Sequence, residues 1–215
     1  MVDADFAKSD DDCMRNPKYC TDGFSFSLFY HAKYKEEPEE LLNLTRQYER
    51  EYLMSTGGDD QGSPGFAIYR EGATLGAIVS TGNLSWTLEI VGAIPQKNSW
   101  ANIGLKWEPH KFENKTDLEH LMTVKEMGLH ELGGLHLYVN LELIGFTLMP
   151  NSLGQGQEVR DGFDPPEMML GCHRTAYQRT KRNFDSGQYD ELAFWDTWLN
   201  ETDNVFMMGG YRKSN

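Results

Sequence analysis

The stretch Phe24-Ser25-Phe26-Ser27-Leu28-Phe29-Tyr30 alternates large apolar residues with serines at its start. Successive side chains of a β-strand point to opposite faces, so Phe24, Phe26 and Leu28 share one face and the two serines share the other. A strand with one apolar and one polar face is typical of a sheet that packs on one side against a core. The segment is therefore predicted to be a strand of a β-sandwich.

The same rhythm continues along most of the chain, as short apolar or alternating runs separated by Gly, Pro, Asn or Asp. Such spacing is typical of an antiparallel sandwich, whose sheets bury their apolar faces against each other. The sequence thus predicts an all-β fold, a two-sheet antiparallel β-sandwich. Its expected strands are Phe24–Lys33, Tyr52–Ser55, Gly65–Tyr69, Leu75–Ser80, Trp86–Ile90, Trp100–Trp107, Gly134–Asn140, Glu167–His173 and Tyr189–Trp195.

Length and charge restrict the class of protein. The 215 residues fit one large all-β domain, which buries enough surface to fold without a metal or a dense disulfide net. The balance of 20 Lys+Arg against 33 Asp+Glu gives a net charge of −13. This charge repels phosphate backbones, so nucleic acid is not expected as a partner. No apolar run is long enough to span a membrane, and direct membrane insertion is not expected.

Four Asn-X-Ser/Thr sequons favour an extracellular location, as an excerpt of a longer secreted or cell-surface protein. They begin at Asn43, Asn83, Asn114 and Asn200. Residue frequencies alone give roughly one or two such triplets in a chain of this length. Each lies in or beside a polar stretch from which a glycan could project into water. The alternative is that these are ordinary surface asparagines.

Two stretches depart from the strand rhythm. Residues 36–50 and 117–132 place apolar residues at helical spacing, which predicts one or two short helical insertions on loops. An elaborated surface loop without a partner is the simpler interpretation of both. The expected organisation is a lead-in over 1–12, one domain over 13–210 with these insertions, and a tail over 211–215.

The order of these segments resembles the laminin-G/pentraxin-like domains, which have a concanavalin A-like jelly-roll fold. Cys13 and Cys20 before Gly23–Ser27 resemble the family's opening strand, and Gly65–Tyr69 resembles its second characteristic strand. Trp100–Trp107 and Gly134–Asn140 are similar to two further strands. Tyr189–Asp196 with Leu199 resembles the closing strand. The resemblance implies the same sandwich and an extracellular recognition role.

The chain also departs from this family. Leu141 stands where the family usually has a glycine after Asn140, which predicts a wider hairpin turn. Asp59 and Asp60 match one of the two pentraxin calcium loops, but Gly171–Thr175 in place of the second loop has no carboxylate. Calcium needs six to eight oxygens, so a double calcium site is not expected. A single structural Ca²⁺ at Asp59 and Asp60 stays open beside the simpler reading of solvated turn aspartates.

The three cysteines are expected to divide into one pair and one left over. Cys13 and Cys20 lie close in sequence and should form a disulfide in an oxidising compartment. Cys172 is then either a buried free thiol on a core strand or paired to another part of the parent protein.

No catalytic set is found, and the chain is not expected to be an enzyme. His130 and His136 are six apart across a Gly-Gly break, whereas a zinc helix needs histidines four apart. Asp190 and Glu191 are adjacent and point to opposite faces, so they cannot flank a glycosidic bond. Of the five tryptophans, most are expected in the core, and Trp198 is the candidate for stacking on a glycan.

These features predict a recognition or adhesion module that binds protein or glycan partners through loops, alongside other domains of the same parent chain. The first alternative is a Ca²⁺-dependent, lectin-like glycan binder. A polysaccharide-cleaving enzyme on the same sandwich and a purely architectural domain are the weaker alternatives.

Overall fold

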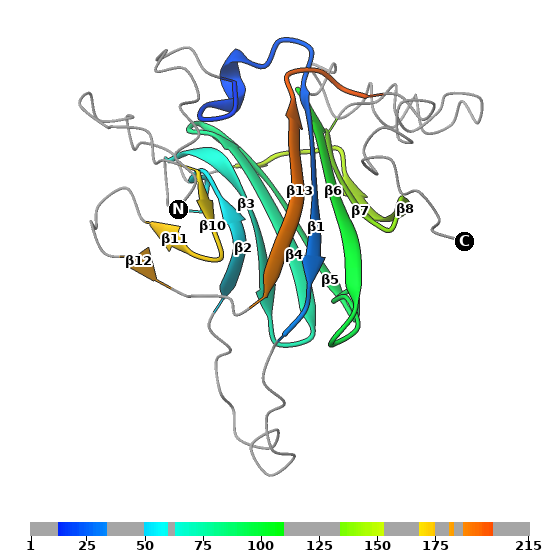
Figure 1. Cartoon of the computed structure of the whole chain (residues 1–215). Coiled ribbons are helices and arrows are strands. Elements are labelled where there is room, and N and C mark those ends of the chain that lie inside the picture. Colours follow the sequence, from blue (N-terminus) through cyan, green and yellow to red (C-terminus); the bar gives the residue numbers. More distant parts are fainter. Residues whose placement is uncertain are drawn as a thin grey trace.

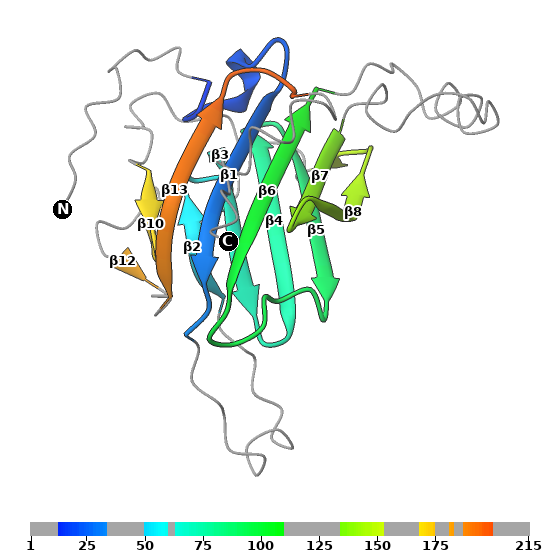
Figure 2. The same ribbon diagram turned by 45° about the vertical axis from the view of Figure 1, so that its right-hand side comes forward.

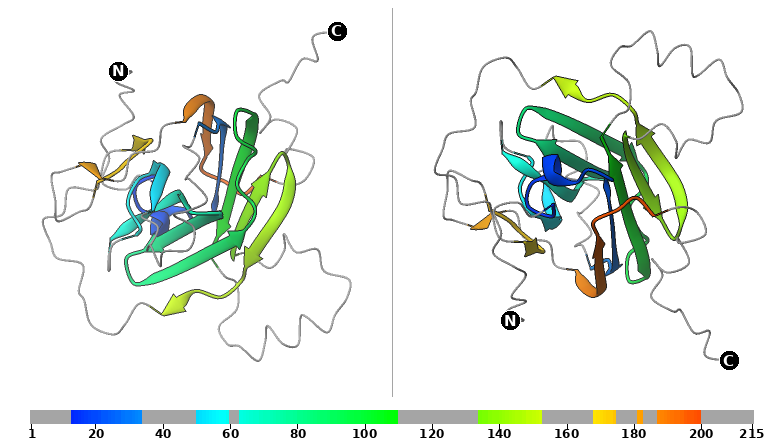
Figure 3. Two further views of the ribbon diagram at one scale, coloured as in Figure 1. Left: turned by 90° about the horizontal axis from the view of Figure 1, so that it is seen from below. Right: turned by 90° about the horizontal axis from the view of Figure 1, so that it is seen from above.

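A computed structural model describes residues 13–33, 50–59, 63–109, 134–152, 168–174, 181–182 and 187–199. Two antiparallel sheets face each other, as Figures 1 and 3 show, so the predicted β-sandwich is confirmed. One sheet has five strands in the order β13-β1-β6-β7-β8, and the other has six in the order β10-β2-β3-β4-β5-β9. A small third sheet pairs β11 with β12.

The strands of the five-stranded sheet are β1 (Phe24–His31), β6 (Trp100–Glu108), β7 (Gly134–Val139), β8 (Glu142–Thr147) and β13 (Gln188–Trp195). The six-stranded sheet contains β2 (Glu51–Ser55), β3 (Pro64–Glu71), β4 (Thr74–Thr81), β5 (Leu84–Val91), β9 (Asn151–Ser152) and β10 (Met169–Leu170). The small sheet is β11 (His173–Arg174) with β12 (Lys181–Arg182), and a short 3-10 helix, η1 (Pro17–Tyr19), precedes β1.

The core lies between the two large sheets and is built from the alternating apolar residues. Phe24, Phe26 and Leu28 of β1 are fully buried, as their alternation predicts. Phe24 packs against Phe66 of the opposite sheet with ring centroids 4.8 Å apart. Trp86 and Trp107 join the sheets through an edge-to-face contact at 5.2 Å. Aromatic pairs across the two layers therefore hold the sandwich together.

The hairpin between β7 and β8 is tighter than predicted. Val139 pairs with Glu142, so only Asn140 and Leu141 form the turn. Both have positive φ, 52° and 67°, which is the backbone of a type I′ turn. The expected wider turn is therefore wrong, because Leu141 adopts the left-handed conformation that the absent glycine would have supplied.

Other differences concern the later strands. The strand β8 was not predicted, because Glu142–Thr147 does not show strict alternation. The single strand expected over Glu167–His173 is divided at Gly171, which has a φ of 69°. Residues 36–49 and 117–132, where helical insertions are predicted, lie outside the described residues. Within the part of the chain that the structure describes, no helix is long and apolar enough to cross a membrane.

Strand direction places the connections at two ends of the sandwich, as Figure 2 shows. The helix η1 and the turn between β4 and β5 lie at one end, near the start of β1. The β3–β4 and β5–β6 connections lie at the other, where the main chain of Ala32, which follows β1, bonds to Asn98 and Ser99. The start of β2 is at this second end, and it positions the polar cluster described next.

Candidate functional site

The outer face of the six-stranded sheet, which points away from the core, carries a second buried cluster. Tyr52, Ala67, Tyr69 and Ile78 form it, separate from the main core. Each has a core-facing neighbour in sequence, such as Leu53 or Ile68. The alternation of β2, β3 and β4 therefore serves two apolar layers, one on each side of the sheet.

A row of side chains crosses four strands on this face. Tyr52 of β2 pairs with Tyr69 of β3, Tyr69 with Gly76 of β4, and Gly76 with Glu89 of β5. A Cβ atom at Gly76 would lie 2.3 Å from Cζ of Tyr69. The absence of a side chain at Gly76 thus lets the Tyr69 ring lie across β4. The Tyr69 hydroxyl then donates a hydrogen bond to Glu89 Oε1 at 2.7 Å.

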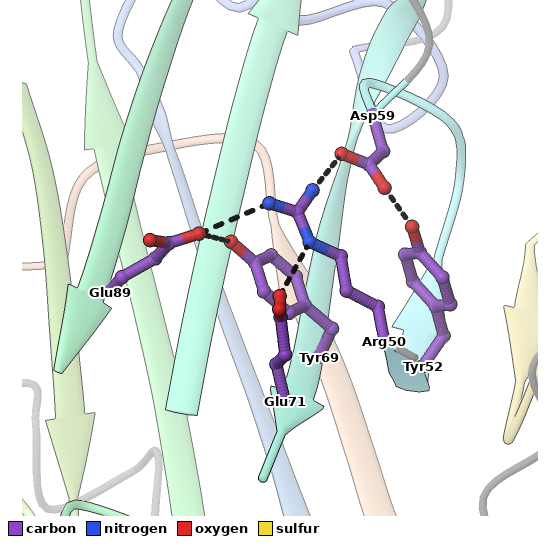
Figure 4. Close-up of polar contacts among 6 residues, drawn as sticks. All are labelled: Arg50, Tyr52, Asp59, Tyr69, Glu71 and Glu89. Atoms are coloured by element: carbon purple, nitrogen blue, oxygen red, sulfur yellow. Dashed lines mark hydrogen bonds and ion pairs between the residues drawn. The ribbon is translucent and has the colours of Figure 1, made fainter. Parts of the chain in front are cut away.

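Arg50, the residue before β2, is the centre of the polar contacts around this row (Figure 4). Its Nη1 contacts Asp59 Oδ1 at 2.6 Å, its Nε contacts Glu71 Oε2 at 3.2 Å, and its Nη2 contacts Glu89 Oε1 at 3.1 Å. We refer to Arg50, Tyr52, Asp59, Tyr69, Glu71 and Glu89 as the Arg50 cluster. The guanidinium unites residues from four separate places in the sequence.

Aromatic rings support the guanidinium and one of its carboxylates. The Cζ atom of Arg50 lies 4.4 Å from the centroid of the Tyr69 ring, a cation–π contact. The Tyr52 hydroxyl donates to Asp59 Oδ2, and the rings of Tyr52 and Tyr69 are 6.0 Å apart. Since both tyrosines are buried, the charged groups rest on a rigid aromatic base.

The surroundings alter the ionisation of two members of the cluster. Burial, followed by the hydrogen bond to Glu89, raises the pKa of Tyr69 far above its usual value, so this phenol stays protonated. Burial acts to lower the pKa of Arg50, but Asp59 and the other neighbouring acidic groups outweigh it, and that pKa is raised. Both residues therefore act as hydrogen-bond donors throughout the physiological range.

The outer edge of the cluster is open to solvent. The exposed fractions of the side chains are 32% for Arg50, 38% for Glu71 and 47% for Glu89. A second row, beside the row of Tyr52 and Tyr69, contains Arg50 and Glu71. It continues to Thr74 and the highly exposed Val91, because Glu71 pairs with Thr74 and Thr74 with Val91. A guanidinium, two carboxylates, a hydroxyl and an aliphatic side chain therefore lie side by side on one surface.

Asp59, predicted as a calcium ligand, is part of this cluster. Its two carboxylate oxygens contact Arg50 and Tyr52 respectively. Among the described residues, no group of three or more His, Cys, Asp or Glu side chains is placed to hold a metal ion. Asp60, the second predicted ligand, lies outside the described residues, so the single calcium site stays a prediction.

The predicted disulfide is confirmed, with Cys13 and Cys20 joined at an S–S distance of 2.05 Å. The bridge closes the loop that carries η1, which contacts β3 and β4. Cys172 is buried and forms no disulfide with the described residues, so both predicted alternatives, a buried thiol and pairing to another part of the parent protein, stay predictions.

One of the four predicted glycosylation sites can be placed. Asn83 is exposed in the turn between β4 and β5, where a glycan would project away from the sheets. Asn43, Asn114 and Asn200 lie outside the described residues.

Trp198, the candidate for stacking on a glycan, is half-buried and packs against the outer face of the five-stranded sheet, and its glycan contact stays a prediction. Its ring contacts His136 edge-on at 4.8 Å. Ser25 Oγ donates to Thr197 O and accepts from Leu199 N, both at 2.9 Å, which holds this segment on the sheet. The exposed tryptophan is Trp100, at 48%, which was expected in the core.

Sequence reasoning did not single out Arg50, Tyr52, Tyr69, Glu71 or Glu89. Arg50 was included in the insertion over 36–50, and the others stood on or beside predicted strands. The available signal was the alternation within Gly65–Tyr69, which places Tyr69 opposite the core-facing Ile68. Two tyrosines on the outer faces of neighbouring strands could have been found in this way.

Comparisons with known proteins do not identify a family for this chain. No known family model matches the chain, and no curated protein matches it either. The resemblance to laminin-G and pentraxin-like domains therefore stays a prediction.

Three solved structures are similar to the chain at low identity. One is a structure of botulinum neurotoxin type C, a toxin described as entering cells through interaction with two ganglioside molecules. It has 11% identity and a TM-score of 0.49, over 90% of this chain and 37% of that one. The receptor-binding domain of botulinum neurotoxin type G has 12% identity and a TM-score of 0.46, over 87% and 38%. Sheep galectin-11 has 9% identity and a TM-score of 0.37, over 81% and 91%. The chain thus spans less than two fifths of the neurotoxin chains.

Proposed function

We propose that this domain is an extracellular recognition module that binds a hydroxyl-rich ligand, a saccharide, at the Arg50 cluster. The observation that carries the proposal is the pre-organised set of polar groups on the outer face of the six-stranded sheet, where Arg50, Glu71 and Glu89 are open to solvent. Binding sites combine apolar surface with a few fixed polar groups that orient the ligand. The Arg50 cluster has both, because its donors and acceptors rest on two buried tyrosines.

The hydrogen-bonding capacity of the cluster suits a saccharide. Arg50 uses three of its five N–H groups on Asp59, Glu71 and Glu89, which leaves two donors. Glu71 Oε1 and Glu89 Oε2 take no part in these bonds and are acceptors for sugar hydroxyls. Val91 and the methyl group of Thr74 provide apolar contact for the ring carbons. Neighbouring strands lie about 4.8 Å apart, so a row over four strands covers roughly 14 Å, enough for a short oligosaccharide.

The binding groups are already fixed in place. Each contact of Arg50 with a carboxylate restrains a flexible side chain before any ligand arrives. Ordering such side chains at the moment of binding would cost about 0.5–1.5 kcal/mol each. A ligand at the Arg50 cluster avoids much of this cost, and this supports recognition over a purely architectural role.

An extracellular location fits two features of the chain. The disulfide between Cys13 and Cys20 is stable in oxidising compartments. Asn83 is exposed within a sequon at the end of the sandwich opposite the start of β2. A glycan at Asn83 would therefore leave the Arg50 cluster accessible.

The test is binding to an array of neutral, amino and acidic oligosaccharides, followed by calorimetry with any ligand found. Arg50→Gln should weaken binding at least tenfold, because the remaining carboxylates lose their restraint and the ligand loses two donors. Arg70→Gln is the matched control. Arg70 lies between Tyr69 and Glu71 in sequence, points to the other face, and pairs with Glu51. Thermal unfolding of both variants would separate a loss of fold from a loss of binding.

The rival functions give different results in the same experiment. Loss of binding on addition of a chelator would favour a calcium-dependent lectin over the proposed mechanism. Release of shortened oligosaccharides would show an enzyme. The proposal fails if nothing on the array binds, or if Arg50→Gln binds as tightly as the parent chain.

A further inference from the structure

The charges of the Arg50 cluster do not balance. Among the described residues, one guanidinium faces three carboxylates, Asp59, Glu71 and Glu89, so the formal charge of these four groups is −2. The nearby pair of Arg70 with Glu51 is neutral in itself and does not change this sum. The whole chain also has a negative net charge, −13.

The excess negative charge is greatest where a ligand would approach. Asp59 is mostly buried and has both oxygens engaged, with Arg50 and Tyr52. Glu71 and Glu89 are the more exposed acids, and each has one oxygen outside the network. The positive charge of Arg50 is shared among all three carboxylates. A ligand at the open edge therefore meets two incompletely neutralised carboxylates.

From this arrangement we infer that the Arg50 cluster selects saccharides by charge, and that its ligand class is neutral or amine-bearing sugars and not acidic ones. The inference rests on the proposed saccharide-binding function and adds the class of ligand. A carboxylate or sulfate on the ligand would be repelled by Glu71 and Glu89, whereas an ammonium group would form charge-assisted hydrogen bonds with their unused oxygens. A ligand with a neutral hydroxyl at this position should bind with intermediate affinity.

The geometry of Arg50 supports the same order of affinity, in which an ammonium group binds better than a carboxylate. A bidentate carboxylate on the ligand would need paired N–H groups of one guanidinium. Arg50 already directs Nη1, Nη2 and Nε to three different acids, and its guanidinium lies over the ring of Tyr69. The two N–H groups that Arg50 retains are on Nη1 and Nη2, and each shares its nitrogen with an N–H already bound to Asp59 or Glu89. An acidic group bound to them would therefore lie beside these carboxylates. An ammonium group avoids this repulsion, because it uses acceptors that the network leaves available.

The test compares matched short oligosaccharides of one length and linkage that differ in one substituent, a hydroxyl, an ammonium or a carboxylate, in gluco, galacto and manno series. The ammonium form should bind about tenfold more tightly than the hydroxyl form, the order expected of one charge near two partly exposed opposite charges. The carboxylate form should bind more weakly than both. Added salt should reduce the difference between the forms, because these charges are screened.

Variants of the two exposed acids test the cause. The double variant Glu71→Gln and Glu89→Gln keeps the shape of both side chains and removes two negative charges. It should lose the preference for the ammonium form and gain at least fivefold in affinity for the carboxylate form. Glu142→Gln is the control, since Glu142 is exposed on β8 of the other sheet and changes the overall charge without touching the cluster.

The outcomes separate this inference from the proposed function. If no member of any series binds, the saccharide-binding function fails, and the charge preference fails with it. If the carboxylate forms bind best, or if the double variant keeps the parent's order of preference, the function stands and the inference is overturned. The order ammonium, hydroxyl, carboxylate in the parent chain, lost in the double variant alone, supports it.

Discussion

Gly76→Ala is the smallest change that should dismantle the aromatic base of the Arg50 cluster. The added Cβ would lie 2.3 Å from Cζ and 2.4 Å from Cε2 of Tyr69, inside any normal contact distance. Gly76 does not have a positive φ, so alanine is compatible with its backbone. The effect should therefore come from the collision alone. Tyr69 is fully buried, and its ring can yield only by leaving Glu89 and Arg50.

The size of the effect follows from the contacts that Tyr69 would lose. A hydrogen bond to a charged acceptor contributes about 1.5–3 kcal/mol, and the lower end applies because Glu89 is half exposed. The cation–π contact with Arg50 contributes about 0.5–1 kcal/mol. Alanine returns about 0.4–1 kcal/mol by restricting the unfolded chain. The free energy of unfolding should fall by about 1.5 kcal/mol.

Urea unfolding followed by circular dichroism would measure this as a lower midpoint at an unchanged slope. Tyr69→Leu provides the control, since it removes the ring atoms with which alanine collides. In that background Gly76→Ala should be neutral or slightly stabilising, and a double-mutant cycle should give a coupling of at least about 1.5 kcal/mol. An equal cost of Gly76→Ala in both backgrounds would refute the reasoning, because the ring would then not be the cause.

Three further predictions concern other parts of the chain. Leu141→Gly should raise the free energy of unfolding by about 1 kcal/mol in urea titrations. The reason is that leucine in the left-handed conformation destabilises the folded state more than glycine does. A loss of stability would contradict the turn described. Tyr69, whose pKa is raised by burial and by Glu89, ionises in the unfolded chain before it does in the folded one, so stability should fall as pH rises above about 10, by up to about 1.4 kcal/mol per pH unit. Tyr69→Phe should make that fall shallower in alkaline unfolding curves, and an identical slope would count against a buried phenol. Replacing Cys13 and Cys20 together by serine should cost about 2–3 kcal/mol, measured as a lower melting temperature that reductant no longer changes.

The fold was largely predictable, because the signal for each strand is local. Alternation in Phe24–Tyr30 identified the core face of β1, and the same signal placed most of the other strands. The β7–β8 turn was not predictable in the same way, since its tightness depends on Leu141 taking a conformation that leucine disfavours. The exposure of Trp100 was missed for a related reason. Trp100 is the first residue of β6 and lies beside His31 on the outer face of the sheet, so packing in the core does not determine the orientation of its side chain.

The Arg50 cluster was not predictable because its members meet through register and not through spacing. Tyr52, Tyr69 and Glu89 lie in one row only if β2, β3, β4 and β5 pair as they do, and a shift of one residue would turn Tyr69 into the core. The β2–β3 pairing also contains an irregularity between Tyr52 and Met54, which no local pattern indicates. Register is determined by the packing of the whole sheet. A site built across strands is thus invisible to motif spacing even where every strand is predicted, and outer-face tyrosines opposite a glycine are the feature to search for in such sequences.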